Sequence, residues 1–294
     1  MRIGIAGLGR LGSAIAERLA ERGNDLIVWN RSAGKAQPLV DLGAVAATSP
    51  ADLASRSEIV LTVLTDAAAV EAVYGAPDGL LAGDADGKLF IEMSTVRPET
   101  ETALAGRVRS RGAGFLECPV GGTVGPARLG KLIALVGGET ADLQRARPVL
   151  EQLCRRIDHA GPVGAGASLK LAINLPLLVF YQALGEAYAL CEHLGHDPAK
   201  LMELFADTSG GPNILKVRGE VIGAVLAGRE TGEPAFTVEL ARKDLRLMIA
   251  EAARLGTTLP LAERTLAIYD ELAGAGGNKR DASALAGYWP NKRA

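Results

Sequence analysis

The sequence of 294 residues is poor in cysteine and histidine, with three residues of each kind. Cys118, Cys154 and Cys191 form an odd set with no close pair, which excludes a disulfide framework and a zinc knuckle. The three histidines lack the i, i+4 pair with a following acid that zinc proteases use, so we expect no metal site. Sparse, unpaired cysteines favour a reducing compartment, and we expect a cytoplasmic protein.

An excess of charge of one sign is also missing. Lys and Arg number 32 and Asp and Glu number 34, which gives a formal net charge of −2 and argues against a general nucleic-acid binder. With 48% hydrophobic and 22% charged residues, the composition excludes wholesale disorder. The most apolar long stretch, Leu169 to Leu190, holds four polar or charged residues, which a membrane span seldom tolerates. Glycines interrupt the N-terminal apolar run, so we expect no signal peptide.

The first half of the sequence alternates between short β-rich runs and segments of helical periodicity. The expected strands are Arg2–Ala6, Asp25–Trp29, Glu58–Leu64, Leu89–Met93, Phe115–Glu117 and Leu132–Val136. The expected helices are Leu11–Arg22, Ala33–Leu42, Ala67–Val73, Glu99–Arg111 and Ala141–Leu153, with Asp66 and Thr140 as N-caps. This alternation predicts an α/β Rossmann domain with a mostly parallel, doubly wound sheet.

The second half has no convincing strand. The expected helices are Ala167–Leu194, Pro198–Thr208, Ile214–Leu226, Val238–Leu255 and Leu261–Leu272. We therefore predict a cofactor-binding domain over 1–162 and an all-α substrate and dimerisation domain over 163–294. A long inter-domain helix is expected to start near 167, with a kink or local adjustment at Pro176.

A glycine-rich loop follows the first strand and opens the first helix, with the sequence Gly7-Leu8-Gly9-Arg10-Leu11-Gly12. Gly7 allows a tight turn, Gly9 lets a pyrophosphate approach the backbone, and Gly12 lets helix and strand pack closely. The helix N-terminus adds amide donors and the positive end of a dipole. Both flanks fit the pattern, so the loop predicts a dinucleotide site.

The end of the second strand distinguishes NAD from NADP. NAD sites place an Asp or Glu there to accept from the ribose 2′-hydroxyl, but this chain has the neutral Asn30. Arg31 and Ser32 follow, with Lys35 one turn on, and a guanidinium can hold a 2′-phosphate through forked, charge-assisted contacts. We therefore predict NADP(H) as the cofactor.

Lys170 and Asn174 are four residues apart and share one face of an expected helix. Their neighbours are apolar, and burial lowers the pKa of a lysine, so Lys170 is a candidate proton-transfer group. From the spacing alone, a lysine that merely extends from an apolar interface toward water remains an open alternative.

Four motifs follow one another along the chain. They are the cofactor motif over 7–16, Glu-Met-Ser-Thr-Val-Arg-Pro over 92–98, Glu-Cys-Pro-Val-Gly-Gly-Thr-Val-Gly-Pro-Ala over 117–127, and Gly-Ala-Gly-Ala-Ser-Leu-Lys-Leu-Ala-Ile-Asn over 164–174. With these motifs the chain resembles the β-hydroxyacid dehydrogenase family, the group of 3-hydroxyisobutyrate dehydrogenase, tartronate semialdehyde reductase and the glyoxylate/succinic semialdehyde reductases. A fifth piece, Lys243-Asp244-Leu245, matches the lysine-bearing motif of the helical domain.

The resemblance implies a role for each matching residue. Lys170 is the expected general acid/base, with Asn174 holding the substrate oxygen beside it. Thr95 and the backbone at Leu64 and Thr65 are expected near the nicotinamide. The remaining implied contacts are Lys243 over the cofactor or substrate, and Gly121, Gly122 and Thr123 at the substrate carboxylate. The resemblance also implies a homodimer or homotetramer.

The chain departs from the family pattern in its substrate loop, which usually reads Ser-Gly-Gly. Gly121 stands where the serine hydroxyl would help to hold a carboxylate, and Thr123 lies two residues later. A second departure is Leu175 after Asn174, where another asparagine is common. A less polar pocket that prefers a smaller or less charged carbonyl is the expected consequence.

The expected reaction is hydride transfer between nicotinamide C4 and a small aldehyde-acid carbonyl or 3-hydroxy acid, with Lys170 handling the proton. Cofactor and substrate are expected to meet where the carboxyl edge of the sheet faces the helices. One alternative is an NADPH-dependent imine reductase, although such enzymes generally lack the lysine. Another is a protein that binds NADPH without turnover.

Overall fold

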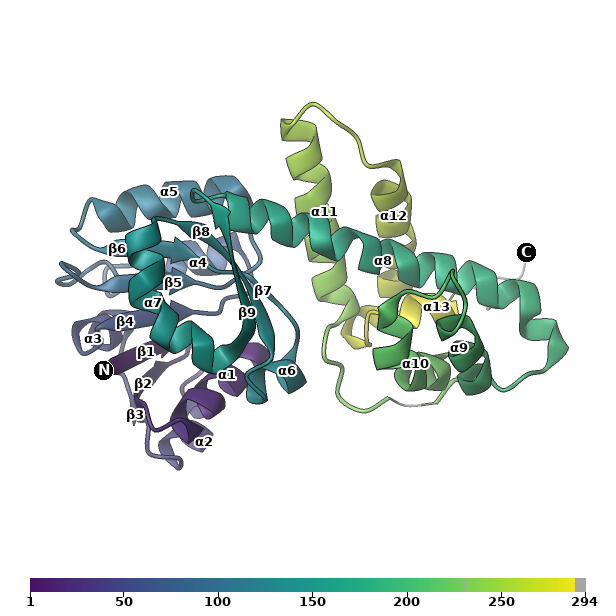
Figure 1. Cartoon of the computed structure of the whole chain (residues 1–294), viewed down its shortest axis with the longest axis horizontal. Coiled ribbons are helices and arrows are strands. Elements are labelled where there is room, and N and C mark those ends of the chain that lie inside the picture. Colours follow the sequence, from purple (N-terminus) through teal and green to yellow (C-terminus); the bar gives the residue numbers. More distant parts are fainter. Residues whose placement is uncertain (230, 289–294) are drawn as a thin grey trace. The chain divides into compact units, whose positions relative to one another are not determined.

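The protein is described here by a computed structural model covering residues 1–229 and 231–288. Packing divides the chain into two compact units, one up to Lys170 and one from Leu171 onward. The first unit is a mostly parallel α/β sheet domain and the second is helical, which confirms the expected fold class (Figure 1). The boundary between the units lies inside a helix, eight residues after the predicted 162/163 boundary.

One mixed sheet forms the centre of the first unit. Its strands are β1 (Arg2–Ala6), β2 (Asp25–Trp29), β3 (Val45–Ala46), β4 (Ile59–Thr62), β5 (Leu89–Glu92), β6 (Gly114–Glu117), β7 (Val120–Gly121), β8 (Leu132–Gly138) and β9 (Cys154–Gly161). They follow the order β3-β2-β1-β4-β5-β6-β8-β7, with β9 also paired to β8. Only β6 with β8 and β7 with β8 pair antiparallel among the described strands, so the mostly parallel sheet is confirmed.

Helices cover both faces of this sheet. They are α1 (Arg10–Glu21), the 3-10 turn η1 (Ala33–Ala36), α2 (Gln37–Val40), α3 (Pro50–Ser55), α4 (Ala67–Gly75), α5 (Pro98–Arg109), α6 (Val124–Arg128) and α7 (Thr140–Leu153). Leu89 and Ile91 pack with α1 and α7 on one face, whereas Phe90 between them packs with α4 and α5 on the other. Alternate residues of a strand point to opposite faces, and burial of both faces explains why these strands are continuously apolar.

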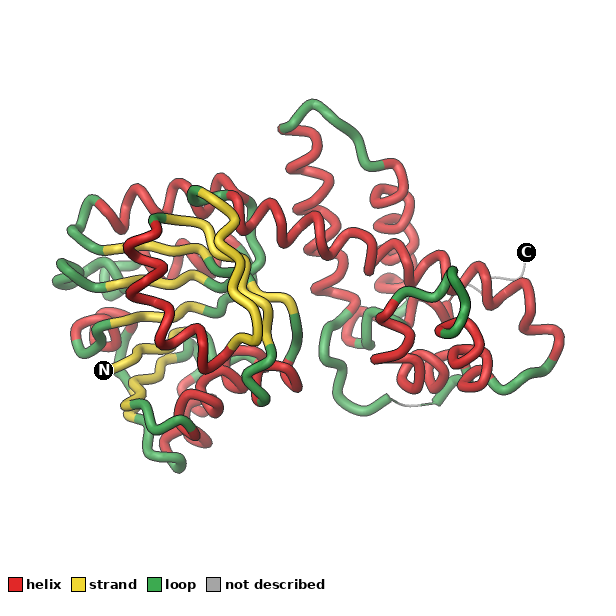
Figure 2. Tube along the Cα trace, viewed as in Figure 1, coloured by secondary structure: helices red, strands yellow, loops and turns green. Residues whose placement is uncertain are grey.

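The second unit consists of helices and loops over its described residues (Figure 2). Helix α8 (Ala165–Cys191) begins in the first unit and continues into the second. The other helices are η2 (Glu192–Leu194), α9 (Pro198–Ala206), α10 (Asn213–Leu226), α11 (Val238–Arg254), α12 (Pro260–Gly274), η3 (Gly277–Lys279) and α13 (Ala284–Tyr288). Their core contains the buried Tyr181 and Tyr269, and the Tyr269 hydroxyl donates to the Ala282 carbonyl at 2.9 Å. Burial of a tyrosine ring with its hydroxyl satisfied anchors the C-terminal segment against α12.

Helix α8 is long and continues through Pro176. Residues 165–194 are long and apolar enough to cross a membrane by length and composition, and 39% of the best window is buried. The core helix of a globular protein meets the same criterion. Leu178, Tyr181 and Leu184 belong to the core of the helical unit, which accounts for the apolar character of α8.

Two local predictions about the ends of helices have different outcomes. The Asp66 side chain accepts from the Ala69 backbone N–H at 2.8 Å, so the predicted N-cap of α4 is confirmed. The predicted N-cap at Thr140 is wrong, because Thr140 is the first residue of α7 and Glu139 occupies the cap without a side-chain bond. One extra residue of helix therefore displaces the expected cap.

Candidate active site

Several candidate loops leave the sheet at one edge. The last residues of five neighbouring parallel strands are in register: Ala6 pairs with both Trp29 and Thr62, Thr62 pairs with Glu92, and Glu92 pairs with Glu117. The glycine loop, the residues after β2, and the loops with the 64–65, 94–95 and 121–123 motifs all start at or just after this line. Ligands of open α/β sheets bind outside the carboxyl ends of the strands, so this edge is the candidate cofactor site.

The glycine loop has the space that a dinucleotide needs. An added Cβ at Gly7, where φ is +98°, would lie 2.3 Å from the Val63 carbonyl oxygen, and one at Gly12 would lie 2.0 Å from the Gly7 carbonyl oxygen. A Cβ at Gly9 would meet nothing within 4 Å. Gly7 and Gly12 are therefore required by close packing, whereas Gly9 leaves an open approach to the backbone.

The N-terminus of α1 is suited to an anion. Gly9 occupies the cap position without a side-chain bond, and the first turn of the helix carries no acidic residue. The first amides of a helix have no partner within the helix, and they carry the positive end of its dipole. The residues present thus fit a pyrophosphate at this position.

Asn30 supports the glycine loop from the end of β2. Its Oδ1 accepts from the Leu8 backbone N–H at 3.0 Å, and its Nδ2 donates to the Ser32 carbonyl at 3.1 Å. The Gly7 N–H also donates to the Trp29 carbonyl at 3.0 Å. Asn30 was predicted as a cofactor contact. In the structure its side-chain amide instead bonds to the glycine loop at Leu8 and to the turn after β2 at Ser32. The spacing between Gly12 and Asn30 does not predict this supporting role.

The candidate groups for a 2′-phosphate come directly after Asn30. Arg31, Ser32 and Lys35 are exposed, and the Lys35 backbone N–H donates to the Ser32 carbonyl at 3.0 Å in the turn that starts η1. The turn keeps these three residues together at the end of β2. Two exposed cations and a hydroxyl can form a phosphate site there.

The two loops predicted near the nicotinamide are joined by Ser94. Its Oγ accepts from the Leu64 backbone N–H at 2.8 Å and donates to Glu92, whose Oε2 accepts from the Ser94 N–H at 2.9 Å. This connection places the backbone at Leu64 and Thr65 beside the loop that carries Thr95. The role of Ser94 was missed from the sequence, although the residue lies in the motif over 92–98.

Buried acids lie behind these loops. Burial raises the pKa of Glu92, and burial followed by repulsion from Glu92 raises that of Glu101 well above its usual range. As a carboxylate, Glu101 has no hydrogen-bond donor for either oxygen among the described residues. Its protonated form can donate to Glu92 instead, which is a further cause of its raised pKa, together with the charge of Glu117. Burial likewise raises the pKa of Tyr74, whose hydroxyl is 3.0 Å from the Thr62 hydroxyl.

The predicted substrate loop lies on and after β7. Gly122 has φ +117° and an added Cβ would lie 2.9 Å from Leu132 Cδ2, so this position needs glycine. At Gly121 an added Cβ would meet Ile133 Cβ at 3.6 Å, an ordinary contact. Thr123 precedes α6 and makes no capping bond with its side chain. Cys118, before the loop, is buried and burial raises its thiol pKa, in agreement with a packing role.

The helix that carries the candidate residues Lys170 and Asn174, α8, begins beside a buried acid. Glu117 Oε1 accepts from the backbone N–H groups of Gly164 and Gly166, each at 2.7 Å. Lys170 comes one turn after Gly166 in α8 and is 9% exposed. The low exposure fits the predicted proton-transfer group better than an extended interface lysine.

Asn174 is held within the helical unit by Asp244 of α11. The Asn174 Nδ2 donates to Asp244 Oδ2 at 3.1 Å, while Lys243 Nζ lies 2.8 Å from Asp244 Oδ1. Asp244 is 2% exposed. This buried carboxylate orients both an amide and an ammonium that the sequence predicted as site residues.

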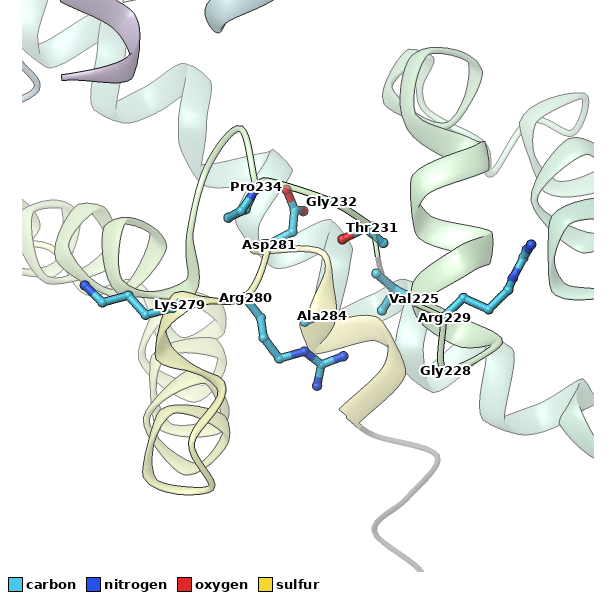
Figure 3. Close-up of a pocket in the computed structure, with 10 residues that line it drawn as sticks. All are labelled: Val225, Gly228, Arg229, Thr231, Gly232, Pro234, Lys279, Arg280, Asp281 and Ala284. Atoms are coloured by element: carbon cyan, nitrogen blue, oxygen red, sulfur yellow. The ribbon is translucent and has the colours of Figure 1, made fainter. Parts of the chain in front are cut away.

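The helical unit also contains a hollow of about 530 Å³ beside α10 and the segment after α12. Its basic side chains do not converge, because Arg229 and Lys279 point away from Arg280 and from each other (Figure 3). Lys279 bonds to Glu239 at 2.8 Å, and Asp281 is engaged with Arg218 at 2.8 Å. Among the described residues that line it, the hollow thus has no convergent polar groups of the kind that form a ligand site.

Comparison with known proteins gives the family. Residues 2–161 match the NAD binding domain of 6-phosphogluconate dehydrogenase, and residues 164–289 match the NAD-binding region of NADP-dependent 3-hydroxyisobutyrate dehydrogenase. The chain belongs to the 3-hydroxyisobutyrate dehydrogenase, or β-hydroxyacid dehydrogenase, family. It is an oxidoreductase of the CH–OH class with an NAD(P)-binding domain.

Relatives of this β-hydroxyacid dehydrogenase family member align over most of their length. The 3-hydroxyisobutyrate dehydrogenase of Pseudomonas aeruginosa is 36% identical over 88% of this chain and 88% of its own. The NAD-dependent L-serine dehydrogenase of the same organism is 33% identical, over 97% of this chain and 96% of its own. The solved structure of Psf3 in complex with NADP⁺ and 2-OPP is 28% identical with a TM-score of 0.85, over 97% of this chain and 99% of that one.

Proposed function

We propose that this chain is an NADP-dependent β-hydroxyacid dehydrogenase or semialdehyde reductase that acts on a small aldehyde-acid carbonyl or 3-hydroxy acid. The observation that carries the proposal is the pair Lys170 and Asn174, one turn apart on α8, with Asn174 held by Asp244. The glycine loop at the sheet edge, with its open Gly9, supplies the matching cofactor site.

Bound at that edge, the nicotinamide supplies hydride chemistry, and the protein supplies orientation and proton handling. In the reducing direction the Lys170 ammonium donates a proton to the oxygen that becomes the hydroxyl. In the oxidising direction the neutral amine takes it back. A positioned acid/base of this kind contributes about 10²–10⁴-fold to a rate. Asn174 fixes the substrate oxygen, and its bond to Asp244 keeps the amide in one orientation.

NADP rather than NAD is the cofactor that the residues after β2 favour. Asn30, which stands where an NAD site has an acid, is neutral and already bonded to Leu8, and Arg31 and Lys35 put two cations just after it. The similarity to Psf3 in complex with NADP⁺ supports this choice. Because the similar L-serine dehydrogenase is NAD-dependent, cofactor preference varies among relatives and rests here on Arg31.

The substrate class is inferred from the loop over Gly121–Thr123. Its backbone can hold a carboxylate, but position 121 offers no hydroxyl. We therefore propose a small substrate with a weakly held carboxylate, and we expect reduction as the cellular direction.

We also propose a homodimer or homotetramer in the cytoplasm. Large apolar side chains exposed on the helical unit, Leu190 at 80% and Val217 at 72%, support self-association. Light scattering of the purified protein tests the assembly, and a monomer at micromolar concentration would contradict it.

The deciding experiment measures NADPH oxidation with glyoxylate, succinic semialdehyde, methylmalonate semialdehyde, tartronate semialdehyde and uncharged aldehydes, with NADH as the second cofactor. Lys170→Ala is expected to lose about 10²–10⁴-fold in kcat while it keeps its affinity for NADPH. Lys200→Ala, an exposed lysine on α9, is the matched control and is expected to behave as wild type. Tight NADPH binding without turnover of any carbonyl, or full activity in Lys170→Ala, contradicts the proposal.

A further inference from the structure

A row of buried acids lies behind the candidate site. Glu92 and Glu117 end the neighbouring strands β5 and β6, are register partners, and have no exposed surface. Glu101 reaches them from α5 and is equally buried. Like charges on paired residues of adjacent strands repel each other, so this arrangement costs stability. We therefore expect a contact of these acids that offsets the loss of stability.

The space around the Glu117 carboxylate exists because two neighbouring residues, Gly137 and Gly166, have no side chain. An added Cβ at Gly137, its register partner on β8, would lie 2.0 Å from Glu117 Oε1. One at Gly166 would lie 3.2 Å from the same oxygen and 2.3 Å from the Leu135 carbonyl oxygen. The carboxylate thus fits between β8 and the first turn of α8, where it accepts the two 2.7 Å bonds from Gly164 and Gly166.

The position of Glu117 affects the next turn of α8. Gly166 and Lys170 are four residues apart, so they lie one above the other on the same face of the helix. A group that fixes the Gly166 amide therefore also fixes the helical turn that carries the Lys170 side chain. A displacement of about 1 Å at a reacting group can cost on the order of a hundred-fold in rate.

We propose that Glu117 is a positioning residue for the reaction, whose ionised carboxylate holds the first turn of α8 and thereby aligns Lys170 with the substrate oxygen. The inference rests on the proposed function, in which Lys170 is the acid/base. The glycine loop follows β1, which β4 and β5 separate from β6, so we expect Glu117 to contribute nothing to binding of the pyrophosphate.

The charge state of Glu117 is set by the groups around it. Burial, assisted by the charge of Glu92 on β5, raises its pKa to about 7, while the backbone N–H groups at the start of α8 lower it. Glu101 on α5 and Cys118 after β6 also face it, and the pKa of each is raised in part by the Glu117 charge. Charge-assisted bonds to backbone amides are stronger than neutral ones. The first turn of α8 is therefore held more firmly as the pH rises through about 7.

Glu117→Gln is the sharpest test. The amide keeps an oxygen that can accept both bonds and loses only the charge, and its NH₂ group takes the place of Oε2, for which no hydrogen bond is found among the described residues. We expect kcat to fall about ten- to a hundred-fold, with the Kd for NADPH unchanged. We also expect the acidic limb near pH 7, present in the wild-type kcat profile, to disappear.

Two further variants make the test independent of folding. Glu92→Gln removes a charge that raises the pKa of Glu117, so the acidic limb is expected to move to lower pH. Glu117→Asp keeps the charge, but its side chain is one methylene shorter and lies farther from the Gly164 and Gly166 amides. This variant is expected to have a lower kcat and still to show an acidic limb in its pH profile. A Glu117→Gln enzyme with the wild-type pH profile overturns the proposal.

A readout without substrate separates this proposal from the proposed function. The rate at which Lys170 is labelled by an amine-reactive reagent, followed by mass spectrometry from about pH 6 to 9, is expected to differ between wild type and Glu117→Gln. Wild-type turnover with identical labelling overturns the role of Glu117 alone. Different labelling without any carbonyl turnover overturns the proposed function and leaves the coupling of Glu117 to Lys170 in place.

Discussion

The side-chain oxygen of Asn30 accepts a hydrogen bond at 3.0 Å from the backbone N–H of Leu8. The end of β2 and the glycine loop are thereby one structural unit, and the residue after Asn30 is held at a defined place beside the loop. We therefore propose that cofactor discrimination in this chain depends on Arg31, because the Asn30 amide, which stands where NAD sites have an acid, is already bonded to Leu8.

Arg31→Ala is expected to raise the Kd for NADPH about ten- to a hundred-fold, since a hydrogen bond to a charged group contributes about 1.5–3 kcal/mol. The Kd for NADH is expected to stay the same. Fluorescence titration with both cofactors measures this, with the exposed Arg22→Ala as control. Equal weakening of both cofactors would mean that Arg31 does not contact a 2′-phosphate.

Gly9 and Gly12 offer a matched pair of substitutions. Gly9→Ala places a methyl group in open space, so Tm is expected to change little while affinity for the cofactor falls by about ten-fold or more. Gly12→Ala forces a methyl group against the Gly7 carbonyl and is expected to destabilise the fold by about 1–3 kcal/mol. Thermal melts and cofactor titrations separate the two effects, and a Gly9→Ala variant with wild-type affinity would contradict the phosphate site.

Gly121→Ser restores the hydroxyl that the family usually has. Position 121 has room for a side chain, and Gly121 is not among the glycines with φ in the left-handed region. We expect KM for carboxylate-bearing aldehydes to fall about ten-fold, with no change for uncharged aldehydes. Gly122→Ser is the contrasting variant, because its φ of +117° and the contact with Leu132 predict a destabilised protein. An unchanged KM for both substrate classes in Gly121→Ser would show that 121 does not contact the carboxylate.

Asp244 connects Asn174 to Lys243, and two variants divide its role. Asp244→Asn keeps an oxygen for the Asn174 amide and loses the charge beside Lys243, whereas Asp244→Ala loses both. We expect kcat/KM to fall by about ten-fold in the first variant and by about a further ten-fold or more in the second. Steady-state kinetics with circular dichroism as a folding control measures the difference. Equal losses in both variants would mean that the bond to Asn174 has no part in catalysis.

Stability is expected to depend on the ionisation of Glu117. Its pKa is raised from 4.5 to about 7 in the folded chain, so between these values the folded state holds a proton that the unfolded state releases. The free energy of unfolding therefore falls as pH rises through this range, by a few kcal/mol at most from this group. Tm measured from about pH 5 to 8 is expected to fall less steeply in Glu117→Gln than in wild type. Parallel curves would contradict the raised pKa.

Much of the fold was predictable because its signals are local. Continuous apolar runs such as Leu89–Glu92 and the helical periodicity of α11 gave elements within a few residues of their ends. The strand β9 was missed because Arg155, Arg156 and Asp158 give Cys154–Gly161 a polar pattern. It pairs with β8, and no property of the segment itself reveals a partner elsewhere in the chain.

Candidate site residues could be named from local motifs in a similar way. Residues in family motifs, such as Lys170 and Gly9, could be named as candidates from the sequence. The hydrogen bonds that support these residues could not be predicted from the sequence. The bond between Leu64 and Ser94 joins residues 30 positions apart, and the bond between Gly166 and Glu117 joins residues 49 positions apart. Such contacts depend on strand register, which the sequence does not display.

The start of α8 has a practical meaning for exchanging parts between relatives. The packing boundary lies after Lys170, but the amides that Glu117 holds belong to Gly164 and Gly166. A chimera joined at 170/171 inherits its lysine together with the acid that aligns it. A junction placed at 162/163 takes Lys170 from one parent and Glu117 from the other. Such a chimera requires that the acid of one parent can bond to the helix amides of the other as Glu117 does here.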